Sequence, residues 1–199
     1  MNTILILGVC LSVALAYPTG PPTSACSSMI PGHGDPTVTG PPPYEITVGS
    51  STYATGAPVQ VTISGDSETQ FRGFFVQARV NDAQFTTNPA LGVFSDFPAS
   101  TGGVDCSNSD SGWGHTDNTD KNSVMANWTY TGECEDVGNL AFRITVVQGN
   151  PPTRYWTDIV TENLRFDKQM CVAGGGAGFI ISSFFTIASS IIVAVLLAY

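Results

Sequence analysis

Apolar and polar residues alternate with a period of two in four stretches of the chain, at residues 59–63, 74–80, 124–130 and 140–147. Such alternation is typical of strands that have one face in a core and the other toward water. Turn signals rich in Gly, Asn, Asp and Pro separate the stretches, at 64–66, 81–82, 102–103, 138–139 and 149–152. Because no helical pattern precedes residue 172, we expect an all-β fold, an antiparallel β-sandwich.

The alternation also predicts which way individual side chains point. On the stretch that contains Trp128, the tryptophan faces the core and Asn127 faces water. The sequence Asn127-Trp128-Thr129 is an N-glycosylation sequon, which needs an exposed asparagine, so Asn127 is a candidate glycosylation site.

Residues 104–123 are polar and predict a long loop held by Cys106. Trp113 lies in this loop between Gly112 and Gly114. A tryptophan between glycines has little reason to lie in a core, so we expect Trp113 to be a candidate ligand contact. The alternative is that its side chain folds back and covers one end of the sandwich.

The first sixteen residues have the features of a secretory signal. Residues 4–16 are an apolar run that ends in Ala14-Leu15-Ala16, which predicts cleavage before Tyr17. Residues 17–25 follow as a proline-rich leader.

Residues 172–199 form an uncharged, apolar tail with small residues at its start. The favoured interpretation is a glycosylphosphatidylinositol (GPI) anchor signal with attachment at Gly174. A single spanning helix and a buried core helix are the alternatives. A GPI anchor or a spanning helix would hold the chain at the cell surface through its C-terminus.

The net charge of −9 belongs to the part between signal and tail, since all seven Lys and Arg and all sixteen Asp and Glu lie there. An acidic surface repels nucleic acid and anionic lipid, so no nucleic-acid partner is expected. The absence of any basic run also argues against membrane lysis by a cationic helix.

Four cysteines remain after the signal, and an even number in an exported chain predicts two disulfides. They are Cys26, Cys106, Cys134 and Cys171. Their spacing permits three pairings and contains no zinc knuckle.

Catalytic and metal chemistry is poorly represented. The two histidines, His33 and His115, each have one nearby aspartate, at Asp35 and Asp117, which is too few for a metal site. No Gly-x-Ser-x-Gly motif is present. Four acids of the polar loop could suit calcium as an alternative, but they are typical of a solvated edge: Asp105, Asp110, Asp117 and Asp120. We expect no enzyme activity, no metal and no cofactor.

Several motifs together resemble the Reeler (reelin-N) domain. They are Cys26-Ser-Ser-Met-Ile-Pro-Gly-His33-Gly34, Pro43-Tyr44-Glu45-Ile46, Phe71-Arg72-Gly73-Phe74-Phe75-Val76-Gln77-Ala78-Arg79, His115-Thr116 with Lys121 and Trp128, and the strands at 137–147 and 155–156. The resemblance covers residues 26–166, and it assigns a Reeler domain to residues 26–171. Before Cys134 the chain has Tyr130-Thr131-Gly132-Glu133, where many members of the family carry an Ala-Pro pair. This difference affects the expected conformation of the local turn and not the expected fold.

The resemblance implies an immunoglobulin-like or fibronectin-like sandwich with disulfides Cys26–Cys106 and Cys134–Cys171. It also implies a non-enzymatic, extracellular binding module in innate defence, with a microbial surface glycan or an extracellular protein as partner. Cell adhesion or matrix binding is the alternative function. Ferric reduction by longer relatives needs modules for which this chain has no room.

Overall fold

The computed structural model describes residues 19–32, 38, 40–148 and 154–171. The predicted signal, the apolar tail with Gly174, and the pair His33 and Asp35 lie outside these residues. Among the residues that are described, no helix has the length and apolar character needed to cross a bilayer.

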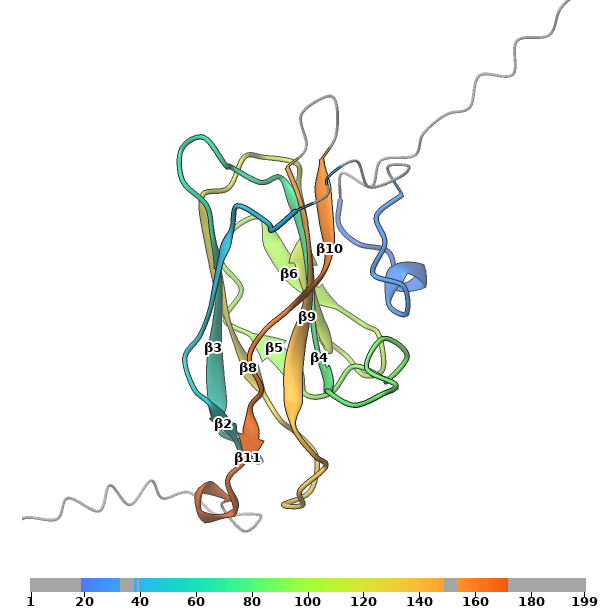
Figure 1. Ribbon diagram of the computed structural model, residues 1–199, viewed down its shortest axis with the longest axis vertical. Helices are drawn as coiled ribbons and strands as arrows, with labels where there is room; N and C mark the ends of the chain where they lie inside the picture. The colour runs from blue at the N-terminus through green and yellow to red at the C-terminus, as the bar shows by residue number, and fades with distance from the viewer. Residues whose placement is uncertain (1–18, 33–37, 39, 149–153, 172–199) are drawn as a thin grey trace, which may run out of the picture.

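Eleven strands and two short 3₁₀ helices make up the described fold, which Figure 1 shows as two facing sheets. The elements are η1 (Thr23–Ala25), β1 (Glu45–Val48), β2 (Thr52–Tyr53), β3 (Pro58–Ser64), β4 (Gly73–Val80), β5 (Val93–Ser95), β6 (Thr101–Val104), β7 (Gly112–His115), β8 (Ser123–Thr129), β9 (Leu140–Val147), β10 (Tyr155–Val160), β11 (Arg165–Phe166) and η2 (Lys168–Met170).

Two antiparallel sheets face each other. One has the strand order β1-β3-β8-β5 and the other β10-β9-β4-β7-β6. A small parallel pair, β2 with β11, lies at one end of the sandwich. The predicted antiparallel β-sandwich is confirmed, and all four alternating stretches are strands.

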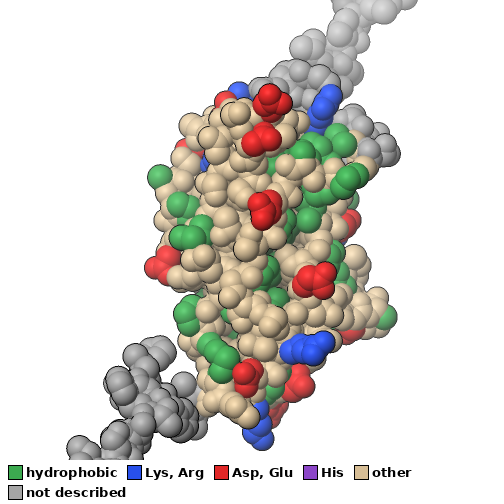
Figure 2. All heavy atoms as spheres, turned by 60° about the vertical axis from the view of Figure 1, so that its left-hand side comes forward, with side chains coloured by type: hydrophobic (Ala, Val, Ile, Leu, Met, Phe, Trp, Pro, Cys, Tyr) green, Lys and Arg blue, Asp and Glu red, His purple; other side chains and the backbone are tan. Residues whose placement is uncertain are grey.

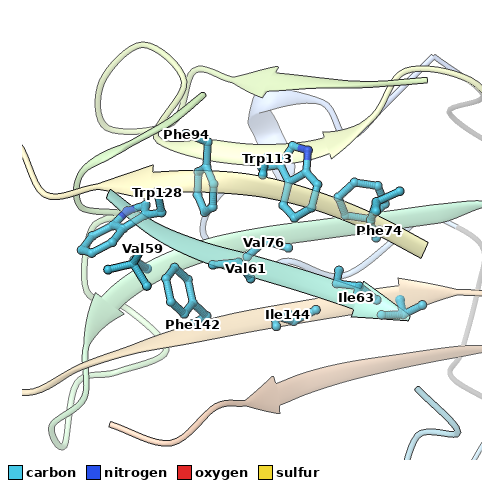
Figure 3. Close-up of a cluster of buried hydrophobic side chains, with 14 of the residues drawn as sticks. Val59, Val61, Ile63, Phe74, Val76, Phe94, Trp113, Trp128, Phe142 and Ile144 are labelled. Carbon is cyan, nitrogen blue, oxygen red and sulfur yellow. The ribbon is translucent and has the colours of Figure 1, made fainter. Parts of the chain in front are cut away.

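The core fills the space between the two sheets, as Figure 3 shows. Inward side chains alternate along each strand, so Val59, Val61 and Ile63 of β3 meet Phe142 and Ile144 of β9 across the layer. Trp128 is fully buried, as predicted, and its indole Nε1 donates to the Leu91 carbonyl at 2.8 Å. Such alternation buries apolar surface on one face of each strand, which is the main favourable term for this fold.

The prediction of one long loop at residues 104–123 is wrong, because Gly112–His115 form strand β7 inside it. The predicted turn at Gly102-Gly103 is also wrong, since both glycines lie within β6 and pair with β7. These segments are short and rich in glycine, so their sequence carries no alternating pattern. Pairing with a neighbouring strand is what makes them extended.

Trp113 is buried in the core, with none of its surface exposed, so its assignment as a ligand contact is wrong. Its ring contacts Phe74 at a centroid distance of 4.7 Å and Phe94 at 5.9 Å. The flanking glycines face the opposite side of β7. A Cβ at Gly114 would lie 2.6 Å from Pro21 Cδ, and one at Gly112 would lie 2.8 Å from the Phe75 ring. The glycines therefore allow other segments to lie against the backbone of β7 while Trp113 packs inward.

The outward faces of β4 and β9 also differ from the sequence expectation of a water-facing side. Seven of the eight residues of β4 and all eight of β9 are buried. Segments outside the two sheets cover this second face.

Replacing Trp113 by alanine should lower the free energy of unfolding by about 3–5 kcal/mol, because it leaves a large cavity beside Phe74 and Phe94. Met125→Ala is the control, since Met125 is 47 % exposed on β8 and should change stability by about 0.5 kcal/mol or less. Chemical denaturation followed by tryptophan fluorescence and circular dichroism measures both. Equal, small losses would mean that Trp113 is not a core residue.

Tyr44 provides a test of the core at alkaline pH. Burial raises the pKa of Tyr44 and of Tyr53 to about 12, whereas an unfolded tyrosine ionises near 10. The folded state thus retains protons that the unfolded state loses. The contribution of these two protonated tyrosines to the free energy of unfolding is complete below about pH 10, and it is lost as the pH rises toward 12.

Tyr44→Phe should reduce this alkaline loss by less than half, because Tyr53 and Tyr130, whose pKa burial also raises, still contribute. It should cost little at pH 7, since the Tyr44 hydroxyl is buried and has no hydrogen-bond partner among the residues that the structure describes. Denaturation curves at pH 7, 9 and 11 check this. An unchanged alkaline slope in the variant would contradict it.

Candidate functional site

Residues 20–32, here called the N-terminal cover, lie on the outer face of the five-stranded sheet (Figure 1). The segment contains η1 and makes few backbone hydrogen bonds of its own, such as Met29 N–H to the Ala25 carbonyl at 2.7 Å. Four of its carbonyls instead accept hydrogen bonds from the sheet.

The carbonyls of four successive residues of the cover, 26 to 29, bind outward side chains of β4 and β9. Cys26 O accepts from Gln77 Nε2 at 3.0 Å and from Arg79 Nη2 at 2.6 Å. Ser27 O and Ser28 O each accept from the Arg143 guanidinium at 3.1 Å.

Thr145 Oγ1 completes the row by donating to the Met29 carbonyl at 2.8 Å. Because buried carbonyls are costly when unpaired, these bonds fix the path of the cover on the sheet.

Two arginines are buried to make these bonds, with Arg79 1 % and Arg143 5 % exposed. Loss of solvent and, to a smaller extent, the positive charge of Arg143 lower the pKa of Arg79 to about 10, although Asp158 acts in the opposite direction. Arg79 is therefore still charged at neutral pH, and it also donates to Gln77 Oε1 and to the Thr86 carbonyl, each at 2.6 Å.

Asp158 supplies the carboxylate for Arg143, whose Nε donates to Asp158 Oδ1 at 2.7 Å. The pairing of β10 with β9 shifts its register between Trp156 and Ile159, and Asp158 has a φ of 56° at this irregularity. Bulges re-aim side chains in this way. Here the bulge aims a carboxylate at a buried guanidinium.

Covalent and apolar contacts complete the attachment of the cover. Cys26 is bonded to Cys106, which closes a loop of 80 residues. Met29 is 2 % exposed and packs with Phe75 and Val104. The second disulfide, Cys134–Cys171, spans 37 residues and ties the end of the described chain to the loop before β9. In the chain-entropy model each bridge stabilises the fold by roughly 4 kcal/mol.

A cleft of about 210 Å³ lies between the cover and the ends of β4, β7 and β9. Its lining consists of prolines, apolar side chains and a few hydroxyls: Gly20, Pro21, Pro22, Ser24, Ala25, Ser28, Met29, Ile30, Pro31, Gly32, Phe74, Phe75, His115, Thr145 and Val147. Among the lining residues that the structure describes, none is Asp, Glu, Lys or Arg. Concave, mostly apolar surfaces with a few polar groups are typical of ligand sites.

His115 lines this cleft and bonds the protein backbone. Its Nδ1 is 3.2 Å from both the amide nitrogen and the carbonyl oxygen of Phe74. The nearby Asp117 is held by Thr119 and by Lys121 Nζ, at 3.1 Å. Hydrogen bonds, first of all from Ser100, keep the Asp117 pKa well below its usual range.

The acids proposed as an alternative calcium loop do not converge. Asp120 pairs with Arg72 at 2.6 Å, Asp117 binds Lys121, and Asp105 accepts the Asp110 amide. Within residues 19–32, 38, 40–148 and 154–171, no three His, Cys, Asp or Glu residues gather as metal ligands would. Figure 2 shows acidic side chains spread over the visible face.

The other predicted site residues have different outcomes. The four cysteines form the two pairs that the resemblance implies. Asn127 is half-buried on β8, with Nδ2 donating to Asp96 at 2.8 Å, and its glycosylation stays a prediction.

Sequence reasoning missed the cleft and its supports. Arg79 and Arg143 occupy polar positions of the alternating strands, and the pattern therefore predicts that they face water. A signal was present, because Gly-Trp-Gly on β7 left room for Pro21 and Phe75. Only the sheet register shows what fills that room.

Replacing Arg79 by methionine should lower the free energy of unfolding by about 3 kcal/mol, because the Cys26 and Thr86 carbonyls lose a charged donor inside the protein. It should also speed proteolysis within residues 20–32. Arg165→Met on β11 is the control, since Arg165 is exposed and should change little. Denaturation and limited proteolysis measure both effects. Equal behaviour of the two variants would show that Arg79 does not hold the cover.

The chain matches a family model described as Reeler domain over residues 24–171. "Putative defense protein 3" of Antheraea mylitta is 37 % identical over 141 residues, covering 69 % of this chain and 80 % of the relative. "Putative defense protein Hdd11" of Hyphantria cunea is 32 % identical over 148 residues, covering 72 % of this chain and 86 % of the relative.

Longer relatives match only in part. "Putative ferric-chelate reductase 1" of Danio rerio is 28 % identical over 176 residues, and this chain spans 28 % of its length. Among solved structures, a human F-spondin reeler domain crystal structure covers 63 % of this chain and 88 % of its own, with a TM-score of 0.49 and 15 % identity. The family match spans both disulfides and every strand described above. The chain belongs to the Reeler domain family.

Proposed function

We propose that this protein is a non-enzymatic binding module that acts in innate defence by recognising microbial surfaces. The observation that carries the proposal is the match to insect relatives named as defense proteins, of which this chain covers 80 % or more. Those relatives consist mostly of the matched region, so their named role belongs largely to it. Reeler domains are extracellular modules.

The architecture supports binding rather than turnover. The carboxylates discussed above serve in ion pairs and turns, whereas the cleft, whose described lining residues are uncharged, offers a concave surface on a rigid sheet. Recognition sites are more exact when rigid elements support them. The reductase named for the fish relative belongs to a protein of which this chain spans 28 %, and we propose no reductase activity here.

Anchorage through the tail is part of the proposal. Cys171 precedes the tail and is fixed by its disulfide at the end of the sandwich where β2 and β11 pair. Leu140 of β9 lies at the same end, bridged to Leu164, while Val147 at the other end of β9 lines the cleft. Leu140 and Val147 are seven residue steps apart along the strand, about 23 Å. An anchor at Gly174 would thus leave the cleft away from the membrane.

Cells that display the full chain should retain washed bacteria or yeast several-fold above mock-transfected cells, with purified wall fractions competing. A fold-disrupting Trp113→Ala variant serves as the negative control for surface display. Retention of matrix proteins but of no microbe would overturn defence recognition in favour of adhesion. Turnover of ester, glycan or ferric substrates by the purified protein would contradict a non-enzymatic role.

Phosphatidylinositol-specific phospholipase C should release the displayed protein and abolish microbe retention. This outcome follows from a GPI anchor at Gly174. Recovery of the intact C-terminal peptide from resistant protein, by mass spectrometry, would instead support a spanning helix.

A further inference from the structure

We propose that the cleft under the N-terminal cover binds an uncharged alkyl chain, such as the acyl chain of a neutral lipid. The inference deepens the proposed function, because it names the chemical class that the binding module takes in this site. The size of the cleft, its hydrogen bonding and its charge support this class of ligand.

The cleft has the size for part of a hydrocarbon rather than for a large ligand. Its volume is about 210 Å³. An apolar cavity of about 150 Å³ accepts benzene, and drug-sized ligands occupy roughly 300–1,000 Å³. The cleft crosses the ends of three adjacent strands, β7, β4 and β9, which spans about 10 Å. An extended chain of roughly octyl length suits these dimensions.

Several hydrogen-bonding groups in and beside the cleft are already engaged. Thr145 Oγ1 donates to Met29 O, and Ser27 O and Ser28 O accept from Arg143. A sugar ring inserted here would bring hydroxyls that find few partners, at a cost of about 1–3 kcal/mol for each buried group. An alkyl chain makes no such demand.

A peptide is also a poor occupant. Extended peptides bind by pairing with a free sheet edge. Strands β4 and β9 are central strands, each already paired on both sides. The main chain of a peptide in this cleft would therefore lack hydrogen bonds, whereas a hydrocarbon has no main chain to satisfy.

Charge and exposure at the mouth agree with this occupant. The protein has a net charge of −9, yet the described residues that line the cleft include no charged side chain. Ile30 lies at the rim and is 56 % exposed, an apolar contact available to a chain that enters. Ser24 and Ser28 are exposed on the cover and can meet a polar head.

The test uses cells that display the full chain and a decanol that carries a photoreactive diazirine on its alkyl chain. After irradiation, mass spectrometry should place the label on the cover or on the lining residues of β4 and β9. Unlabelled straight-chain alcohols from butanol to decanol then compete. Each added methylene should strengthen competition about fourfold until the cleft is filled near octanol, after which the gain should stop.

Ile30→Asp should reduce labelling at least several-fold, because it places a carboxylate at the apolar mouth. Met125→Asp is the matched control, since Met125 is 47 % exposed on the opposite sheet and the charge change is the same. Equal display of both variants at the cell surface shows that they fold.

Several outcomes would overturn the inference: label outside the cleft, equal labelling of the two variants, competition that keeps rising beyond octanol as in membrane partitioning, or stronger competition by N-acetylglucosamine or by an apolar peptide. The failure of this inference differs from the failure of the proposed function. Retention of microbes without labelling of the cleft would contradict only the proposed alkyl site. Labelling of the cleft without retention of microbes would contradict only microbial recognition.

Discussion

The row of hydrogen bonds from β4 and β9 to the N-terminal cover holds this segment on the outer face of the five-stranded sheet. Arg79, Arg143, Gln77 and Thr145 together bind the carbonyls of residues 26–29. Removing a guanidinium from water costs several kcal/mol, so these arginines are tolerable only with their partners in place. The cover and the second buried face of the sheet therefore require each other.

This dependence explains the shape of the candidate site. A segment held by its carbonyls and by Cys26–Cys106 cannot collapse fully onto the sheet, because its path is set by polar atoms and a covalent bond. The space left beside Phe75, Val147 and His115 is the cleft. Its apolar lining follows from the prolines of the cover and from the apolar ends of β4 and β9, and its lack of charge follows from the arginines being engaged elsewhere.

The family match and the cleft address different parts of the functional question. The match to insect relatives named as defense proteins supports a role for the whole domain. The cleft concerns one surface of that domain and a chemical class of ligand. Fold alone does not fix function, so the two proposals rest on separate observations and have separate tests.

The strands that form the main core could be predicted from the amino-acid pattern alone. Alternating residues on β3, β4, β8 and β9 led to the sandwich and to an inward Trp128, because the two-residue period of a strand directly relates pattern to face. The number of cysteines likewise predicted two disulfides, although their pairing came from the family resemblance.

The segment that covers the outer face of β4 and β9, and therefore the cleft beneath it, became visible only in the folded structure. Trp113 read as exposed because its glycine neighbours suggested a loop, yet those glycines make room for Pro21 and Phe75 from distant parts of the chain. Arg79 and Arg143 were predicted to face water, because the alternation shows only that their side chains point away from the inner core. Whether such a face meets water or a segment more than fifty residues away depends on long-range contacts, for which local pattern carries no signal.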